Sequence, residues 1–440
     1  MRIYLHKLGC PKNDVDADYI AARLLSDGHE LVTDPDLAET IIVNTCCFIL
    51  PAREESIEEI LSLANLKKEG RLQRLYISGC MAQHYGDELL SGMPEVDGAF
   101  GLGEIDAIAE AVGTAAKLTD TVKTESRQLS YLHGPQRAVT NSLPYAYLKI
   151  SDGCNRGCTY CVIPQIRGNF RSRPMQAIIE EAKFLASAGK KELVLVSQDA
   201  TLYGYDLKEN GGLIDLLRRL DRVDGVHWIR PMYLHPVQVH TELINYMRIS
   251  NKTLEYFDLP LQHVNSDLLA AMGRQMDRDG IERLIECIRA ASPEAVIRAT
   301  FIVGFPGETQ TQFEELLEFV DQWKLDRVAG FVYSPEEGSP AAGMDDQLAD
   351  ELKNERLDQL MSLQREIAFD KNSALIGTVQ EVIIDSVGPN GAAVGRTRGD
   401  CPEVDQELYI SGSGITVGDI LRVRVEAADG YDLHAMPVED

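Results

Sequence analysis

The sequence lacks any apolar run that could cross a membrane. Its uninterrupted apolar runs, such as 193–196 and 41–43, fall far short of the roughly 20 residues that a membrane-spanning helix needs. The N-terminal residues also lack the long apolar stretch of a signal peptide, and they predict a first β-strand instead. We therefore expect the protein to remain in the cytoplasm and to have no membrane partner.

Basic residues are scarce in this chain. The 43 lysines and arginines stand against 69 aspartates and glutamates, which gives a net charge of −26. Such a surface repels phosphate backbones at long range and attracts basic partners. Charge of one sign also keeps a globular protein soluble without any partner, and composition alone does not choose between the two interpretations.

Low-complexity segments and internal repeats are missing as well, and 440 residues are too many for one ordinary core. Residues 1–113 alternate β-like runs with helical patterns, which is typical of a parallel sheet covered by helices. After a polar linker, 114–142, the same alternation in residues 143–371 predicts a full or partial (β/α) barrel. Residues 372–440 carry four β-rich runs between turn residues, which predicts a small antiparallel β-barrel. The expected class is α/β with three domains.

Nine cysteines occur where disulfides are not expected, so clustered cysteines indicate metal binding or chemistry. Cys154, Cys158 and Cys161 are spaced C-x3-C-x2-C in a glycine-containing loop directly after an expected strand. Three thiolates so close in sequence suit a [4Fe–4S] cluster with one iron left open. A zinc site would need a fourth ligand, and no second cysteine pair or histidine lies nearby. The lone Cys287 and Cys401 are expected to be structural, with Cys287 on the buried face of a helix.

Three further cysteines, Cys10, Cys46 and Cys80, each follow an expected strand of the N-terminal domain. Ligands in open α/β sheets bind at the carboxyl ends of strands, so the three thiols could meet at one edge. From spacing alone they are either ligands of a second metal site or three separate buried thiols.

The central loop closely resembles the radical SAM (S-adenosylmethionine) superfamily, whose hallmark is C-x3-C-x-Φ-C with an aromatic residue at Φ, here Tyr160. The resemblance implies that the open iron binds SAM and that one electron cleaves SAM to a 5′-deoxyadenosyl radical. It also implies that Tyr160 lies near the adenine. Ser197, Gln198 and Asp199 match the positions that contact the methionine part. The turn beginning at Gly304 resembles the segment that lines the adenosine pocket.

The whole chain resembles the methylthiotransferase branch of this superfamily. That resemblance implies a second [4Fe–4S] cluster on Cys10, Cys46 and Cys80, a radical SAM barrel and a C-terminal TRAM domain. It implies two molecules of SAM, one to methylate sulfur and one to make the radical. The doublet Cys46-Cys47 departs from the family, which usually has one cysteine there; the motif Asn-Thr-Cys assigns the ligand to Cys46 and leaves a ligand swap open. No catalytic acid or base can be assigned.

Two branches of that family modify different substrates, an adenosine of tRNA or the β-carbon of an aspartate in small-subunit ribosomal protein twelve. The segments 8–13, 147–154 and 256–263 resemble the ribosomal-protein branch. Residues 372–440 contain four arginines, no lysine and twelve acidic residues, a net charge of −8, which suits a basic protein better than tRNA. The expected partners are therefore this ribosomal protein, free or in its subunit, and a flavodoxin-type or ferredoxin-type electron donor. We expect a monomer.

Two further features leave alternatives open. Arg167, Arg171 and Arg173 form a basic strip after the cluster loop, and they could bind the SAM carboxylate, the substrate aspartate or merely neighbouring acidic residues. A non-catalytic iron–sulfur or RNA-binding adaptor would keep the same fold, although the presence of all six candidate ligand cysteines argues against it.

Overall fold

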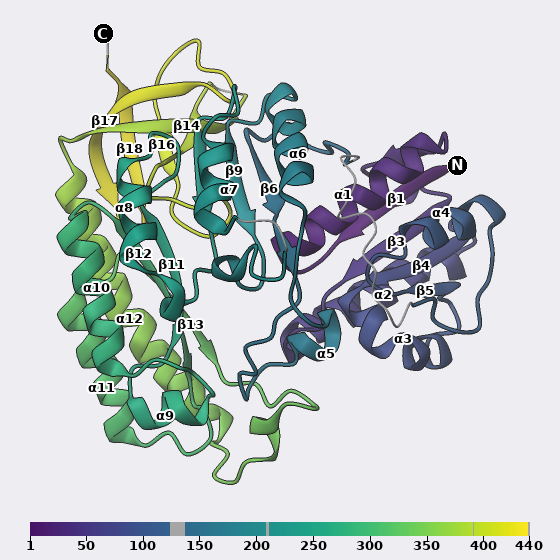
Figure 1. Cartoon of the computed structure of the whole chain (residues 1–440). Helices are drawn as coiled ribbons and strands as arrows, with labels where there is room; N and C mark the ends of the chain where they lie inside the picture. The colour runs from purple at the N-terminus through teal and green to yellow at the C-terminus, as the bar shows by residue number, and fades with distance from the viewer. Residues whose placement is uncertain (124–136, 208–210, 390, 439–440) are drawn as a thin grey trace. The chain divides into compact units, whose positions relative to one another are not determined.

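The computed structural model describes residues 1–123, 137–207, 211–389 and 391–438 (Figure 1). The chain forms two compact units. Unit 1 comprises residues 1–141, 147–156 and 161–181, and unit 2 comprises residues 142–146, 157–160 and 182–440. Part of the expected linker, 124–136, lies outside the described residues. In the part of the chain that the structure describes, no helix is both long enough and apolar enough to cross a membrane.

Unit 1 is built on a five-stranded parallel sheet. Its strand order is β2 (Glu30–Val32), β1 (Arg2–Lys7), β3 (Thr40–Thr45), β4 (Arg74–Gly79) and β5 (Gly98–Phe100). The helices that connect them are α1 (Pro11–Ser26), α2 (Leu50–Lys68), α3 (Cys80–Gly92) and α4 (Ile105–Thr114). Unit 1 also holds β7 (Ser151–Asp152), α5 (Ile163–Arg167) and β8 (Arg171–Ser172).

Helices cover both faces of this sheet, and the central strand shows it. Every residue of β3 is buried. Ile41 and Val43 pack with residues of α2 and α3, whereas Ile42 packs with residues of α1 and α4. Successive side chains of a strand point to opposite faces, so a strand whose residues are all buried requires a layer on each side.

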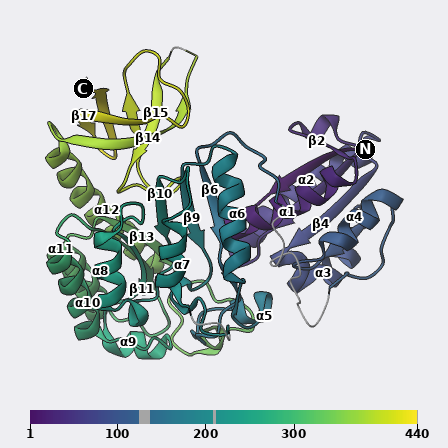
Figure 2. The same cartoon turned by 45° about the horizontal axis from the view of Figure 1, so that its top comes forward.

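Unit 2 contains the remaining strands and helices of the barrel-like region. Strands β9 (Glu192–Val196) and β10 (Trp228–Pro231) pair in parallel, as do β11 (Tyr256–Gln262), β12 (Val296–Val303) and β13 (Arg327–Val332). Figure 2 shows the helices on the outside of these strands. They are α7 (Leu213–Leu220), α8 (Thr241–Ile249), α9 (Ser266–Ala271), α10 (Arg278–Ala291), α11 (Gln310–Trp323) and α12 (Asp350–Leu375). Two elements, β6 (Tyr145–Lys149) and α6 (Met175–Ser187), have residues in both units.

A small closed barrel ends the chain. Its strands are β14 (Val379–Val387), β15 (Ala393–Thr397), β16 (Leu408–Ile410), β18 (Asp432–Pro437) and β17 (Ile420–Asp429), in that spatial order. The sequence predicts four antiparallel strands, but the structure has a fifth strand, β18, which pairs in parallel with β16. The barrel closes because this last strand pairs with both β16 and β17. The segment is short and poor in β-branched residues, so its sequence does not predict a strand. The structure otherwise confirms the expected α/β class.

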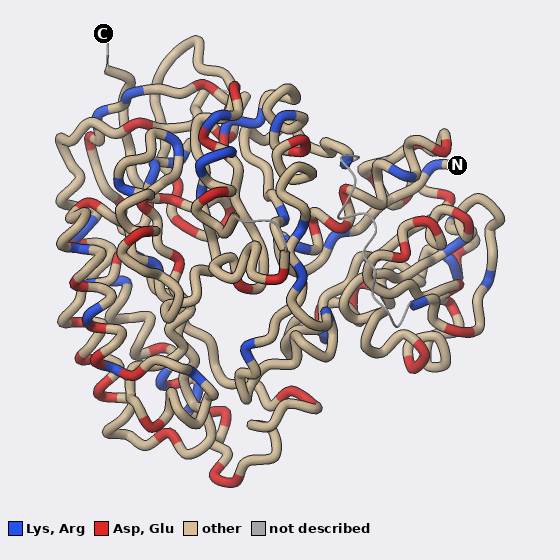
Figure 3. Tube along the Cα trace, viewed as in Figure 1, with Lys and Arg blue, Asp and Glu red and all other residues tan. Residues whose placement is uncertain are grey.

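Acidic residues are distributed along the chain and not confined to one element. Figure 3 shows acidic positions, in red, on helices and loops of both units, interspersed with basic positions in blue. Acidic positions therefore occur in both units.

Candidate functional site

The structure brings Cys10, Cys46 and Cys80 to the same edge of the unit 1 sheet. Cys10 follows β1, Cys46 follows β3, and Cys80 begins α3 directly after β4. These three strands are adjacent and parallel, so their carboxyl ends lie side by side. Burial raises the pKa of the Cys80 thiol to about 12; the Arg167 guanidinium opposes this rise, while the thiols of Cys46 and Cys10 add to it. The thiols of Cys10 and Cys46 therefore lie close enough to Cys80 to affect its ionisation.

Cys46 and Cys47 have different surroundings. The peptide N–H and C=O of Cys46 are both held by the Ser56 hydroxyl, at 3.2 and 2.9 Å. Cys47 is buried in the apolar cluster that contains Ile41 and Ile77, and burial raises the pKa of its thiol. The same cluster contains Cys80, so burial does not distinguish a ligand thiol from a core thiol here, and the assignment of the ligand to Cys46 rests on the motif.

The central cysteine loop depends on one glycine. Gly153 has φ of +78°, and a Cβ atom there would lie 2.2 Å from the carbonyl oxygen of Asn169 and 2.6 Å from that of Gly168. The N–H of Cys154 donates to the Gly168 carbonyl at 3.1 Å. A side chain at position 153 would push this loop off its anchor. Cys154, Cys158 and Cys161 are all half-buried.

Unit 2 holds residues 157–160 of this loop and the positions expected to contact SAM. Thr159 donates its N–H to the Met272 carbonyl at 3.1 Å. The ring of Tyr160 packs on a buried cluster that includes Met272, Phe305 and Tyr333. Since Phe305 directly follows Gly304, the structure brings two of the expected adenosine-pocket positions together.

The remaining expected SAM contacts follow β9. Ser197 is fully buried. The side-chain amide of Gln198 forms no hydrogen bond to any described residue, although it is buried from solvent, so both its polar atoms are available to a ligand. Asp199 accepts a hydrogen bond from the N–H of Thr201 at 3.0 Å. Gly304 lies in a turn with φ of +76°, and its N–H donates to the Glu308 carboxylate.

Two arginines contact candidate ligand cysteines, and no sequence motif predicts either contact. Arg274 lies with Nη1 3.5 Å from the sulfur of Cys158 and donates to the Pro260 carbonyl at 2.6 Å. Arg167 lies with Nη2 3.3 Å from the sulfur of Cys80. The sequence marks Arg167 only as part of a basic strip and gives no signal for Arg274, because each contact joins residues about a hundred positions apart.

The basic strip itself is not a surface feature. Arg167 and Arg173 are almost completely buried, and Arg173 pairs with Glu181 at 2.7 Å. Arg171 is half-buried, and its Nη2 donates to the carbonyl of Arg167 at 3.2 Å. Of the three roles considered for this strip, Arg173 therefore has the last one, which is to pair with a neighbouring acidic residue.

The prediction for Cys287 is wrong, because this side chain is exposed. The apolar face of α10 is formed by Ile281, Leu284, Ile285 and Ile288, and position 287 falls beside that face. Cys401 is buried as expected, with its sulfur 3.8 Å from that of Met232.

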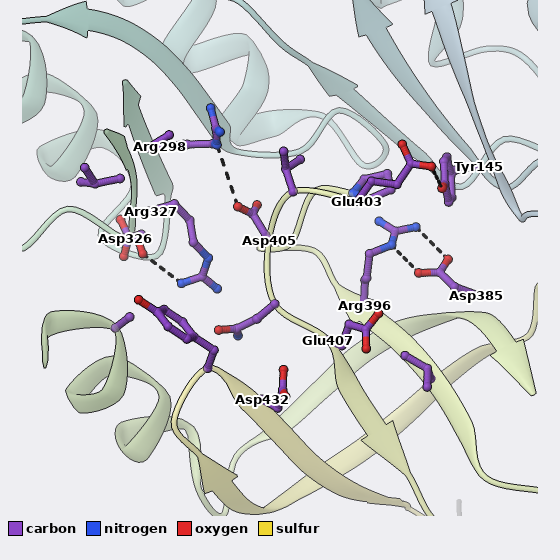
Figure 4. Close-up of a pocket in the computed structure, with 18 of the residues that line it drawn as sticks. Tyr145, Arg298, Asp326, Arg327, Asp385, Arg396, Glu403, Asp405, Glu407 and Asp432 are labelled. Carbon is purple, nitrogen blue, oxygen red and sulfur yellow. Dashed lines mark hydrogen bonds and ion pairs between the residues drawn. The ribbon is translucent and has the colours of Figure 1, made fainter. Parts of the chain in front are cut away.

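A pocket of about 640 Å³ lies in unit 2 where the C-terminal barrel meets β12 and β13 (Figure 4). Several of its charged side chains form ion pairs with one another. Arg298 faces Asp405 at 3.9 Å, and Arg396 holds Asp385 at 2.5 Å. The pocket lies at the amino ends of β12 and β13, whereas Gly304 follows the carboxyl end of β12, where barrel enzymes place their chemistry. We therefore assign this pocket to the structural junction.

Comparison with known proteins decides the family. Residues 2–101 match the model of an uncharacterised protein family, UPF0004, residues 148–320 match the radical SAM superfamily, and residues 376–438 match the TRAM domain. A protein of Bdellovibrio bacteriovorus named ribosomal protein uS12 methylthiotransferase RimO is 42% identical, and the match covers 98% of this chain and 96% of that protein. Its namesake in Syntrophomonas wolfei is also 42% identical, over 98% and 99% of the two chains. This chain belongs to the RimO family of radical SAM methylthiotransferases.

The solved structures agree at the level of the fold. The radical S-adenosylmethionine methyltransferase TsrM from Kitasatospora setae, with cobalamin and a [4Fe–4S] cluster bound, has a TM-score of 0.57 at 13% identity, over 77% of this chain and 76% of that one. Membership of the family makes this chain a radical SAM enzyme whose cofactors are [4Fe–4S] clusters and SAM. The resemblance stated from the motifs is confirmed.

The residues present suit these cofactors. Each candidate site offers three thiols, which matches a cluster with one open iron, and an arginine donor lies beside one thiol of each. Among the described residues, no three His, Cys, Asp or Glu side chains already stand where they could hold a metal ion, so the ligand assignment remains a prediction.

Proposed function

We propose that this chain transfers a methylthio group to the β-carbon of an aspartate in small-subunit ribosomal protein uS12, in the cytoplasm. The observation that carries the proposal is the presence of two three-cysteine sites in one chain of this family. They consist of Cys10, Cys46 and Cys80 at one sheet edge, and Cys154, Cys158 and Cys161 in one loop. The acceptor is inferred from two relatives that are 42% identical and are named ribosomal protein uS12 methylthiotransferase RimO.

Each set of thiols would hold one [4Fe–4S] cluster. When bound, the clusters and SAM supply the radical and sulfur chemistry. The chain would then bind and shield the reactants. Tyr160 and the turn at Gly304 would pack the adenosine, and the side chains of Ser197, Gln198 and Asp199 would bind the methionine part through hydrogen bonds.

The charge of the C-terminal barrel supports a protein acceptor over tRNA. Residues 372–440 have a net charge of −8, and an acidic surface attracts a basic ribosomal protein while it repels phosphates. We also propose that the enzyme acts as a monomer and receives electrons from a flavodoxin-type or ferredoxin-type donor.

The test is an anaerobic reaction of the iron-reconstituted full-length enzyme with SAM, a reductant and sulfide. Purified uS12 and unmodified tRNA compete in the same tube, and both are analysed by mass spectrometry. We expect a methylthio mass increase on one aspartate of uS12. An increase on a tRNA adenosine would overturn the choice of acceptor, and absence of SAM cleavage would favour a non-catalytic adaptor. The variant Cys154→Ala serves as the inactive control.

A further inference from the structure

Arg167 connects, within unit 1, the edge that carries Cys80 with the start of the loop that carries Cys154. It is the last residue of α5, and its side chain is only 1% exposed. One terminal nitrogen, Nη2, lies 3.3 Å from the sulfur of Cys80 and donates to the Asn13 side-chain oxygen at 2.6 Å. The other, Nη1, contacts both carboxylate oxygens of Asp152 at 3.2 and 3.1 Å and one of Asp16 at 3.3 Å.

The partners of Arg167 belong to the two cysteine sites. Asp152 lies two residues before Cys154, and its carboxylate accepts the N–H of Gly153 at 2.8 Å. On the other side, Asn13 holds the three-cysteine edge, because its side chain donates to the carbonyls of Leu8 at 3.1 Å and Thr45 at 2.9 Å. One guanidinium therefore touches a thiol of the first site and the start of the loop that carries the second.

The network around Arg167 is charge-balanced without the thiol. Lys149 is fully buried and lies 2.7 Å from both Asp16 and Asp152, so two cations face two carboxylates. Burial would raise the pKa of Asp152, but Lys149 and Arg167 outweigh it and hold that pKa below its usual range. Arginine suits this position because its planar fork donates in several fixed directions at once, which a lysine cannot do.

We propose that Arg167 is a positioning residue that fixes the Cys80 sulfur against the Cys154 loop and raises the reduction potential of the cluster held by Cys10, Cys46 and Cys80. Hydrogen bonds to cysteine sulfur and nearby positive charge favour the more negative, reduced form of an iron–sulfur cluster. The inference rests on the ligand assignment in the proposed function and does not depend on the acceptor.

Arg173 provides a matched control. It is as deeply buried as Arg167 and lies 2.7 Å both from the Glu181 carboxylate and from the carbonyl oxygen of Lys149. Both of these hydrogen bonds end on oxygen atoms. Replacement of either arginine breaks a buried ion pair, and replacement of Arg167 also removes the contact to the sulfur of Cys80.

The experiment uses the full-length chain with Cys154, Cys158 and Cys161 replaced by alanine, so that only the first cluster is assembled. Arg167→Gln, Arg167→Lys and Arg173→Gln are compared in this background by iron content and by spectroelectrochemical titration. For Arg167→Gln we expect the reduction equilibrium to shift about tenfold toward the oxidised form, a fall of ~59 mV in midpoint potential. Arg173→Gln should stay near the parent value.

The midpoint potentials of the variants decide whether the proposal holds. A midpoint potential of Arg167→Gln equal to that of Arg173→Gln would overturn the proposal. If Arg167→Gln does not fold, Arg167→Lys decides, since it keeps the charge but not the fork: a smaller fall supports the proposal, and a parent-like potential overturns it. Cys80→Ala in the same background separates the two inferences, because retention of the full iron content would refute the ligand assignment itself.

Discussion

Gly9 lies directly against Cys46. A Cβ atom on Gly9 would stand 2.6 Å from the Cβ atom of Cys46 and 3.0 Å from its sulfur, and φ of Gly9 is +93°. The residue before Cys10 must therefore be glycine for the thiols of Cys10 and Cys46 to approach one another. The backbone next to one candidate ligand thus makes room for another.

Replacement of Gly9 by alanine should cost the enzyme one of its two clusters. We expect Gly9→Ala to retain about half of the wild-type iron, because the added methyl group displaces Cys46. Iron analysis after anaerobic reconstitution provides the measurement. Gly28→Ala is the matched control: Gly28 also has a positive φ, +82°, but a Cβ atom there meets nothing within 4 Å. If both variants lose iron equally, crowding of Cys46 is not the cause.

The two adjacent cysteines should respond differently to replacement. Cys46→Ala is expected to lose the first cluster, with about half of the iron. Cys47→Ala should keep the iron and lower the free energy of unfolding by ~1 kcal/mol, because it leaves a small cavity in the core around Ile41 and Ile77. Iron content and denaturant unfolding measure the two effects. Loss of iron in Cys47→Ala alone would reverse the assignment.

His263 should make the fold sensitive to acid. Burial, with a smaller contribution from the charge of Arg356, lowers the pKa of His263 to about 3, against 6.5 ordinarily. Between these values the unfolded chain binds a proton that the folded chain does not. The stability that depends on neutral His263 is therefore fully present above pH 6.5. As the pH is lowered, protonation of this group in the unfolded chain reduces the free energy of unfolding by ~1.4 kcal/mol per pH unit.

The measurement is urea unfolding of metal-free full-length protein between pH 4 and 7. His263→Gln should flatten the dependence of the unfolding free energy on pH by about that slope. His240→Gln, at an exposed position, should leave the dependence unchanged. An equal slope for wild type and His263→Gln would show that His263 is protonated in the folded state.

A buried ion pair should hold the C-terminal barrel within unit 2. Glu192, in β9, accepts from Arg396 of β15 at 2.7 Å, and both side chains are almost fully buried. Glu192→Gln should destabilise the chain by ~3 kcal/mol, because Glu192 is the carboxylate shared by two buried guanidinium groups, those of Arg396 and Arg230, each 2.7 Å away. The exposed pair of Arg218 and Asp215 is the control, and Asp215→Asn should cost less than ~1 kcal/mol. Denaturant unfolding would show equal losses if burial were unimportant.

Much of the candidate site follows from local sequence. Cys154, Cys158 and Cys161 lie within eight residues, so their spacing alone places them in one short loop. The strand-end positions of Cys10 and Cys46 follow from hydrophobic pattern, since the carboxyl ends of adjacent parallel strands meet at one edge. Contacts of this kind depend on periodicity and strand order, which the sequence expresses directly.

Other features arise only when distant segments pack. The sequence determined the α/β class, the positions of six cysteines at strand ends and in one loop, and the acidic character of the C-terminal barrel. Only the tertiary structure decided that Cys287 is exposed, that β18 closes the barrel, and that Arg167 reaches the sulfur of Cys80, 87 positions away. The physical reason is that a buried charge is tolerated only where its partners converge, and that convergence belongs to the packed core and not to any local pattern.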